Sequence, residues 1–137
     1  MEPRSVVEQA VEWLRDHLAE EISIEEMAEG SGVTPFHFLR TFRHWTGVTP
    51  ALYLSALRLE EAKRLLLTTD RSVTDICFDV GGSSLGTFST RFAELTGMSP
   101  SAYRRAALEH PGELPPCISK QVTRPVRNRE ARLGRRV

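Results

Sequence analysis

Residues 38–53 read FLRTFRHWTGVTPALY, and residues 88–103 read FSTRFAELTGMSPSAY. The two stretches share phenylalanines at their first and fifth positions, a Thr-Gly pair, a later proline and a final tyrosine. Similarity at a fixed offset indicates one supersecondary unit that is used more than once. A short apolar segment that ends at a glycine precedes each stretch, at residues 24–32 and at residues 73–81. Each copy therefore reads as helix, short turn, helix, which is the layout of a helix-turn-helix motif.

Capping residues, prolines and glycine stops predict seven helices. Ser5 and Glu8 form a capping box for the first helix, and Ser23 with Glu26 form another for the second. Proline at a first helical position and glycine just past an end delimit the later ones. The expected helices cover about residues 5–18, 23–30, 35–46, 50–67, 72–80, 84–96 and 100–108. No segment alternates apolar and polar residues as a strand would, so we expect an all-α fold.

The helix pattern predicts one bipartite domain over residues 5–108. Its first module covers about residues 5–48, a long linker helix covers about 50–67, and the second module covers about 72–108. From residue 109 to residue 137 the apolar periodicity fails, and prolines and scattered arginines take its place. We expect a weakly ordered basic tail there. Two interpretations of this tail stay open, a solvated charged end and an arm that contacts phosphate or the minor groove.

The charge of the chain is balanced overall but unevenly distributed. The net charge is zero, yet residues 117–137 hold seven basic side chains against one acidic side chain. Basic residues also recur in the reading and connecting segments, as Arg40, Arg43, Arg58, Lys63, Arg64, Arg91, Arg104 and Arg105. A chain with one basic face can bind phosphate while its far side is acidic. Charge therefore permits nucleic-acid binding without demanding it.

Several classes of protein are disfavoured. No apolar run approaches the length that spans a bilayer, and no signal peptide pattern opens the chain. Cys77 and Cys117 lie in unlike settings, so we expect no disulfide, and a reducing cytoplasm fits best.

The second helix of the first unit has an apolar inward face and an outward face with groups that can contact bases. Its inward residues are Phe38, Phe42 and Trp45. The 100° step of a helix then sends outward Phe36, Arg40 and Arg43, with His37 and Leu39 on the flanks. Arginine can bind a guanine edge with two hydrogen bonds, and an exposed apolar side chain can contact a thymine methyl group. This face is suited to reading bases in a major groove.

The corresponding helix of the second unit offers less chemistry. With Phe88, Phe92 and Leu95 inward, its outward residues are Gly86, Thr90 and Ala93, flanked by Thr87, Ser89 and Arg91. These side chains supply few hydrogen-bonding groups for base edges. We expect this helix to depend on backbone and shape contacts and to specify less. Because the two faces differ, the preferred site should be asymmetric, and one chain is expected to occupy it as a monomer.

Hydroxyl residues open several of the expected helices, namely Thr34, Thr49, Ser83, Ser84 and Ser99. A helix start pairs free N–H groups with a hydroxyl, which is a natural phosphate anchor, although each of these residues is also an ordinary helix cap. The linker helix of about eighteen residues would span about 27 Å. That length is close to the roughly 34 Å that separates successive major-groove faces.

Residues 73–92, VTDICFDVGGSSLGTFSTRF, and residues 97–104, GMSPSAYR, closely resemble the second helix-turn-helix of the AraC/XylS family of bacterial transcription regulators. The upstream unit and the long helix are similar to that family's first helix-turn-helix and linker helix, so the resemblance covers about residues 5–107. It implies a seven-helix domain that binds double-stranded DNA through two reading helices in adjacent major grooves. It also implies a regulator that works with RNA polymerase at the nucleoid of a bacterial cytoplasm.

The resemblance also implies roles for individual residues. The base-reading positions are Phe36, Leu39 and Arg40 in the first module and Leu85, Gly86 and Thr90 in the second. The residues expected at the DNA backbone are Thr34, His37, Arg43, Thr49, Ser83, Ser84, Thr87, Arg91 and Ser99.

Three features depart from the family pattern. Gly82 stands where an aromatic residue is usual, from which we expect looser packing under the second turn. Thr90 stands where a long polar side chain is common. The few residues outside 5–108 leave little room for the effector domain of most relatives, so we expect a stand-alone DNA-binding domain.

Two other function classes, an enzyme and a protein-interaction module, compete with this interpretation. His37 and His44 share a helix face but lie about 10.5 Å apart, too far to hold one metal ion. Pro116-Cys117 is similar to an alkyltransferase site, but Ile118-Ser119 follows in place of His-Arg. We therefore expect no enzyme activity, metal or cofactor. A helical protein-interaction module with a basic tail remains the alternative, with Phe36 and Leu39 as its docking patch.

Overall fold

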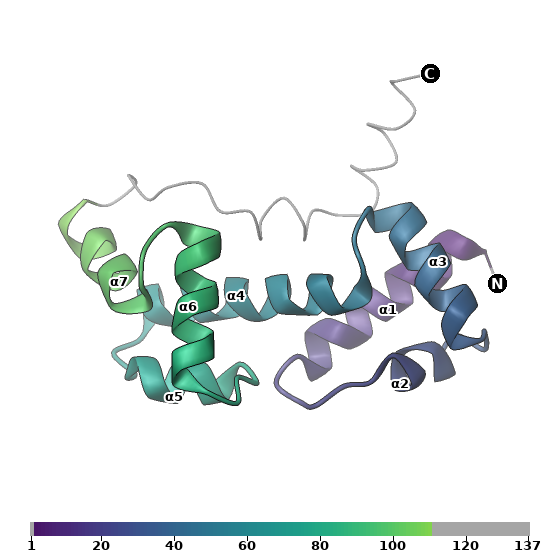
Figure 1. Ribbon diagram of the computed structural model, residues 1–137, viewed down its shortest axis with the longest axis horizontal. Coiled ribbons are helices and arrows are strands. Elements are labelled where there is room, and N and C mark those ends of the chain that lie inside the picture. The colour runs from purple at the N-terminus through teal and green to yellow at the C-terminus, as the bar shows by residue number, and fades with distance from the viewer. Residues whose placement is uncertain (1, 111–137) are drawn as a thin grey trace, which may run out of the picture.

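Seven α-helices and no strand make up the part of the chain that the computed structural model describes, residues 2–110 (Figure 1). The helices are α1 (Pro3–His17), α2 (Ile24–Glu29), α3 (Pro35–Thr46), α4 (Pro50–Thr68), α5 (Val73–Asp79), α6 (Leu85–Thr96) and α7 (Pro100–Glu109). The predicted all-α, bipartite fold is confirmed, and each expected helix is present. The tail predicted from residue 109 falls outside the described residues from residue 111 onward.

The start of α1 differs from the prediction. The helix begins at Pro3 with Glu2 as its N-cap, and no side chain caps it. Proline is favoured in a first turn because its fixed φ suits the helix and its missing N–H would be unpaired there anyway. The predicted Ser5 capping box is therefore wrong, and Glu8 instead accepts a hydrogen bond from Arg4 at 3.0 Å.

The other helices begin as the sequence predicts. A hydroxyl oxygen at each N-cap accepts the N–H three residues later, at Ser23, Thr34, Thr49, Ser72, Ser84 and Ser99. Such a cap stabilises a helix by about 1 kcal/mol. Gly47 and Gly97 end α3 and α6 in the left-handed region, with φ of 82° and 89°.

The sequence repeat returns as a repeat of hydrogen bonds. The buried Thr46 hydroxyl donates to the Phe42 carbonyl oxygen at 2.8 Å and accepts the Val48 N–H at 3.3 Å. Its counterpart Thr96 makes the same two bonds in the second copy, at 2.7 Å and 3.3 Å. The Thr-Gly pair thus turns the chain from one helix into the next in both modules.

Aromatic packing repeats in the same way. The rings of Phe42 and Tyr53 meet edge to face, with centroids 5.4 Å apart and planes at 88°. Phe92 and Tyr103 repeat this contact at 5.5 Å and 81°. Edge-to-face pairs add about 0.5–1.5 kcal/mol beyond the burial of their area. Each module therefore holds its reading helix to the following helix by the same ring pair.

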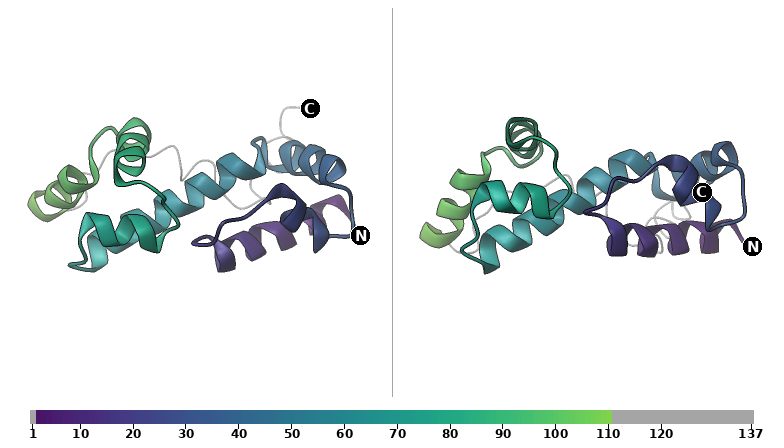
Figure 2. Two further views of the ribbon diagram at one scale, coloured as in Figure 1. Left: turned by 60° about the horizontal axis from the view of Figure 1, so that its bottom comes forward. Right: turned by 90° about the horizontal axis from the view of Figure 1, so that it is seen from below.

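The two modules have separate cores, and α4 contributes to both. Its first half packs with α1, α2 and α3, and its second half packs with α5, α6 and α7. The modules consequently lie at opposite ends of α4, as Figures 1 and 2 show from three directions. The fully buried side chains at the centres of the two cores include Val7, Leu14, Phe38, Phe42, Ala62, Ile76 and Phe92.

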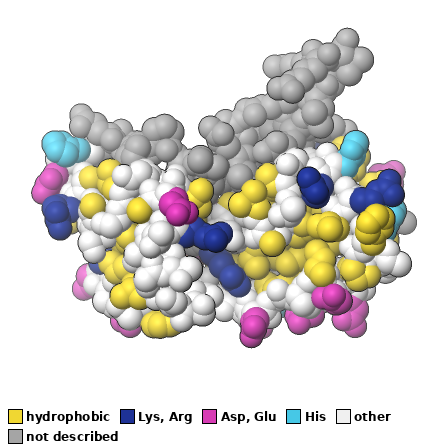
Figure 3. Space-filling model, viewed as in Figure 1, with side chains coloured by type: hydrophobic (Ala, Val, Ile, Leu, Met, Phe, Trp, Pro, Cys, Tyr) yellow, Lys and Arg dark blue, Asp and Glu magenta, His cyan; other side chains and the backbone are white. Residues whose placement is uncertain are grey.

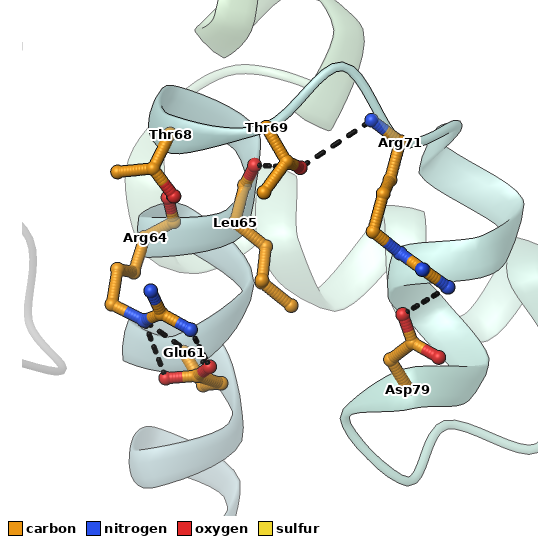
Figure 4. A network of polar contacts seen from close by, with 7 residues as sticks. All are labelled: Glu61, Arg64, Leu65, Thr68, Thr69, Arg71 and Asp79. Carbon is orange, nitrogen blue, oxygen red and sulfur yellow. Dashed lines mark hydrogen bonds and ion pairs between the residues drawn. The ribbon is translucent and has the colours of Figure 1, made fainter.

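A polar network joins the end of α4 to α5 (Figure 4). The Thr69 hydroxyl donates to the Leu65 carbonyl oxygen at 2.6 Å and accepts the Arg71 N–H at 3.3 Å. The Arg71 guanidinium then pairs with the Asp79 carboxylate at 2.6 Å. The connection between the two helices is thus fixed to α4 at one end and to α5 at the other.

Candidate nucleic-acid interface

Helix α3 presents the predicted outward face to solvent. Phe36 is 70% exposed, and His37, Arg40 and Arg43 are exposed as well. Leu39 is half-buried, as expected for a residue on the flank of the helix. The inward prediction is also confirmed, because Phe38 and Phe42 are fully buried and Trp45 packs against the core. A large exposed aromatic side chain needs an explanation, since burying it would stabilise the fold.

Arg40 and Phe36 lie one helical turn apart and contact each other. The guanidinium carbon of Arg40 lies 5.9 Å from the centroid of the Phe36 ring. A cation at this distance over an aromatic ring gains about 0.5–1 kcal/mol at an exposed site. The contact favours conformations in which the arginine side chain lies along the outer face of α3.

Helix α6 presents a smaller and less polar face. Gly86, Thr87, Thr90 and Arg91 are exposed, and Leu85 is 38% exposed. A Cβ placed on Gly86 would meet only the Ser84 hydroxyl, at 3.9 Å. The fold therefore does not require glycine there, and the surface at the start of α6 is open to close approach.

A cleft of about 300 Å³ lies between α4 and the start of α6. Four of the nine residues predicted to contact the DNA backbone line it, namely Ser83, Ser84, Thr87 and Arg91. Arg58 of α4 lines it as well. The three hydroxyls and the Arg91 guanidinium of these four residues form a set of donors suited to a phosphate.

The remaining predicted backbone residues lie at helix starts and on α3. Thr34, Thr49 and Ser99 each use the hydroxyl oxygen to accept a cap bond at 3.2 Å. A hydroxyl that accepts in this way still has its own O–H to donate. These residues are spread over three helix starts, so the structure does not gather them into one site as it does the four residues of the cleft.

Several basic residues that looked available in the sequence have partners within the fold. Lys63 pairs with Glu60 and Arg64 pairs with Glu61, at 3.2 Å and 2.6 Å. Arg58 and Arg104 donate to backbone carbonyl oxygens instead. Side chains held in this way are poorly placed to neutralise phosphate, so Arg40, Arg43 and Arg91 carry more of the expected interface.

Basic and acidic side chains occupy different parts of the surface. On the face that Figure 3 shares with Figure 1, Lys and Arg lie in the middle, over α4 and α6, and at both ends, beside α3 and beside α7. Most Asp and Glu on this face lie toward its edges. An arrangement of this kind attracts a polyanion to the face that carries both reading helices, although the whole chain is neutral.

The turn at Gly82 brings its backbone close to Cys77 of α5. A Cβ at this position would lie 2.7 Å from the Cys77 sulfur and 2.8 Å from the Cys77 carbonyl oxygen. The Gly82 N–H donates to that carbonyl oxygen at 2.8 Å. The backbone of Gly82 therefore packs closely against α5, and the same residue also lines the cleft between α4 and α6.

Sequence reasoning missed a contact between the two modules. Arg58 donates from Nε to the Leu18 carbonyl oxygen at 2.7 Å and from a terminal nitrogen to the Glu20 carbonyl oxygen at 2.8 Å. Gly81 of the second module lies against the same groups. The signal in the sequence was an arginine on the largely apolar helix α4, between the buried residues Leu57 and Leu59.

Comparison with known proteins shows which family shares this sequence and architecture. A family model described as a helix-turn-helix domain matches residues 27–106. The crystal structure of an AraC-type transcriptional regulator from Chromobacterium violaceum superposes with a TM-score of 0.73 at 29% identity, covering 79% of this chain and 96% of that chain. The chain belongs to the AraC/XylS family.

The AraC/XylS relatives differ in how much of their own length this chain matches. The transcriptional activator RhaS of Enterobacter sp. strain 638 is 40% identical over 71% of this chain and 35% of its own length. The transcriptional activator AarP of Providencia stuartii is 33% identical over 73% of this chain and 74% of its own length. The chain thus spans about a third of RhaS but most of AarP.

One AraC-type structure contains DNA. The DNA-binding domain of the global transcriptional factor AdpA was crystallised with a target DNA, and it superposes with a TM-score of 0.71 at 32% identity. The match covers 77% of this chain and 96% of that domain. The described residues form an AraC-type double helix-turn-helix domain, and none of their helices has the length and apolarity that crossing a membrane requires.

Proposed function

We propose that this chain regulates transcription by binding one asymmetric DNA site as a monomer, with α3 and α6 in successive major grooves. The observation that carries the proposal is the pair of exposed, unlike helix faces that a single helix, α4, holds at its two ends. A dimer of identical units would present two equal faces and read a palindrome. One chain with two different faces suits a site with two unlike halves.

The length of α4 supports binding to adjacent grooves. Its 19 residues span about 28 Å at 1.5 Å per residue. Successive major-groove faces on one side of B-DNA are about 34 Å apart. The helix that separates the two modules is therefore of the same order of length as the spacing of the grooves.

The two helices divide the task of recognition. On α3, Arg40 is the main reader of a base edge, and Phe36 and Leu39 contact thymine methyl groups. On α6, Leu85, Gly86 and Thr90 allow close approach and add few hydrogen bonds, so this helix selects by shape. Phosphates are held at both helices and at the cleft by Thr34, His37, Arg43, Thr49, Ser83, Ser84, Thr87, Arg91 and Ser99.

The relatives indicate the setting in which this binding acts. RhaS and AarP are transcriptional activators, and AdpA binds a target DNA. By analogy, the chain acts on promoter DNA in the bacterial cytoplasm and alters the work of RNA polymerase there. The domain over residues 5–108 is the part that binds DNA, and no catalysis is needed for this role.

Selection of bound sequences from random DNA by the full chain tests the proposal. We expect enrichment of two unlike half-sites with centres about one helical turn apart. The half-site that contacts α3 should be the more sharply defined of the two. Enrichment of a palindrome, of a single half-site, or of no sequence would overturn the proposal.

Salt dependence separates DNA binding from the alternative of a protein-docking module. Binding that depends on phosphate contacts weakens linearly in log affinity as log salt concentration rises. We expect this behaviour with the selected DNA, together with a lower slope for Arg43→Ala and for Arg91→Ala. An affinity that does not respond to salt would favour Phe36 and Leu39 as a docking patch for protein.

A further inference from the structure

The loop between α1 and α2 contacts the turn between α5 and α6, and Arg58 lies between them. This guanidinium bonds to the carbonyl oxygens of Leu18 and Glu20, which belong to the first module. Gly81 belongs to the second module, and a Cβ there would lie 3.0 Å from Arg58 Nε and 3.0 Å from the Leu18 carbonyl oxygen. The three segments meet so closely that a methyl group on Gly81 would require its neighbours to shift by a few tenths of an ångström.

Apolar packing reinforces this junction. The Leu18 side chain packs against the cores of both modules. Ala19 also approaches the second module, since its carbonyl carbon would lie 3.2 Å from a Cβ on Gly81. Gly81 has a φ of +89°, so glycine serves both the backbone shape and the close approach. The principal helix contacts otherwise pair helices of one module or join a module to α4.

The chemistry of arginine is suited to this position. The carbonyl groups just past the end of α1 lack partners within the helix, so a donor must reach them. A guanidinium offers several N–H groups in a rigid planar fork, whereas a lysine ammonium is a flexible point donor. Arg58 therefore bonds two carbonyls of one loop at once and holds this loop in a single orientation on α4.

We propose that Arg58 is a positioning residue that fixes the distance and orientation between the two reading helices. It secures the α1–α2 loop to α4, and the secured loop is the surface on which the Gly81 turn of the second module rests. Without it, α4 and the packing of Leu18 and Ala19 would still connect the modules, but no hydrogen bond would hold the loop to the middle of α4. Its consequence for half-site spacing rests on the proposed function.

Arg104 provides a matched control. It also donates to two backbone carbonyl oxygens, from Nε to Leu66 at 3.0 Å and from a terminal nitrogen to Thr69 at 3.2 Å. Both acceptors lie at the end of α4, within the second module. Removing Arg104 thus costs a comparable pair of bonds without touching the contact between modules.

The first experiment measures how each protein tolerates altered spacing. Arg58→Met and Arg104→Met, which keep much of the apolar stem, are compared with the wild type on the selected DNA with one base pair added or removed between half-sites. One base pair shifts the second half-site by about 3.4 Å and rotates it by about 35°. We expect the wild type and Arg104→Met to lose at least about tenfold in affinity on altered spacing. Arg58→Met should lose several times less.

The second experiment needs no DNA. Spin labels on His44→Cys of α3 and Glu94→Cys of α6, both exposed positions, report the distance between the reading helices in a Cys117→Ser background. We expect a narrow distance distribution for the wild type and for Arg104→Met, and a broad one for Arg58→Met. Helical circular dichroism of each variant checks that it is folded. Arg58→Lys, which retains the charge and the stem, serves if Arg58→Met does not fold and should also broaden the distribution.

The two experiments distinguish the possible failures. If Arg58→Met and Arg58→Lys both keep a narrow distribution, or if Arg58→Met keeps the wild-type spacing penalty, the positioning role is wrong. If the distribution broadens in a protein that selects no DNA sequence, the junction is supported and the proposed function fails. If Arg104→Met changes the spacing penalty as much as Arg58→Met does, general loss of stability explains the effect and the proposal is overturned.

Discussion

The guanidinium of Arg40 lies over the ring of Phe36, with its central carbon 5.9 Å from the ring centroid, on the outer face of α3. The ring is 70% exposed and contributes little to the core. Phe36 therefore acts through Arg40 rather than through the core. The contact between them limits the conformations of the arginine before any DNA is bound. A side chain that is already ordered loses less entropy on binding.

Replacing Arg40 tests whether it reads a base. We expect Arg40→Ala to weaken binding to the selected site by about 1–3 kcal/mol and to relax preference at one base pair. Arg40→Lys should recover part of the affinity, since the positive charge remains, but little of the preference, since lysine lacks the bidentate fork. Titrations against the selected site and its single-base variants measure both effects. An unchanged sequence preference in Arg40→Ala would exclude Arg40 as a base reader.

Replacing Phe36 tests whether it orders Arg40. We expect Phe36→Ala to weaken specific binding and to leave the free energy of unfolding nearly unchanged, because the ring is exposed. The effects of Phe36→Ala and Arg40→Ala should not add, and a double-mutant cycle should give a coupling energy of about 0.5–3 kcal/mol, as residues in contact do. Additive effects would mean that the two residues contact DNA independently.

The faces of α3 and α6 could be predicted from the sequence because they follow from local rules. With Phe38 and Phe42 in the core, the helical period directs Phe36, Arg40 and Arg43 outward, and the exposure of these three residues agrees. The helix starts can also be predicted from the sequence, because a hydroxyl residue that can accept the N–H three residues later is a local signal. The first helix is the exception, because proline in the first turn outweighed the capping box at Ser5.

The contacts that the sequence did not reveal are long-range or depend on the path of the backbone. Arg58 lies about forty residues from its acceptors, at separations of 40 and 38 residues, and nothing local marks it as a partner of a loop. The close approach of the Gly82 backbone to α5 depends on the path of the turn, and no local pattern in the sequence indicates it.

The close approach of Gly82 predicts the effect of a methyl group there. We expect Gly82→Ala to lower the free energy of unfolding by about 1–3 kcal/mol, because the added carbon would lie 2.7 Å from the Cys77 sulfur and 2.8 Å from its carbonyl oxygen. Gly30→Ala is the control, since no atom lies within 4 Å of a Cβ there and its φ is −68°. That substitution should be neutral or stabilising by up to about 1 kcal/mol. Equal urea midpoints for the two variants would contradict the packing described for Gly82.

Cys77 predicts a pH dependence of stability. Burial raises the pKa of its thiol, because the thiolate is poorly solvated in the core of the second module. In the unfolded chain a cysteine ionises near pH 8.5, so above about that pH the folded state holds more protons than the unfolded state. The free energy of unfolding then falls as pH rises, by up to about 1.4 kcal/mol per pH unit, and the contribution is fully present only below pH 8.5.

The comparison of Cys77→Ala with its parent, both in a Cys117→Ser background, isolates this contribution. We expect Cys77→Ala to be less stable at pH 7, because the substitution leaves space in a buried site. The stability difference between the two proteins should shrink from pH 8 to pH 10, since only the parent loses the contribution of the protonated thiol. Urea unfolding at each pH measures it. Two parallel pH profiles would show that the Cys77 thiol titrates alike in the folded and unfolded chains.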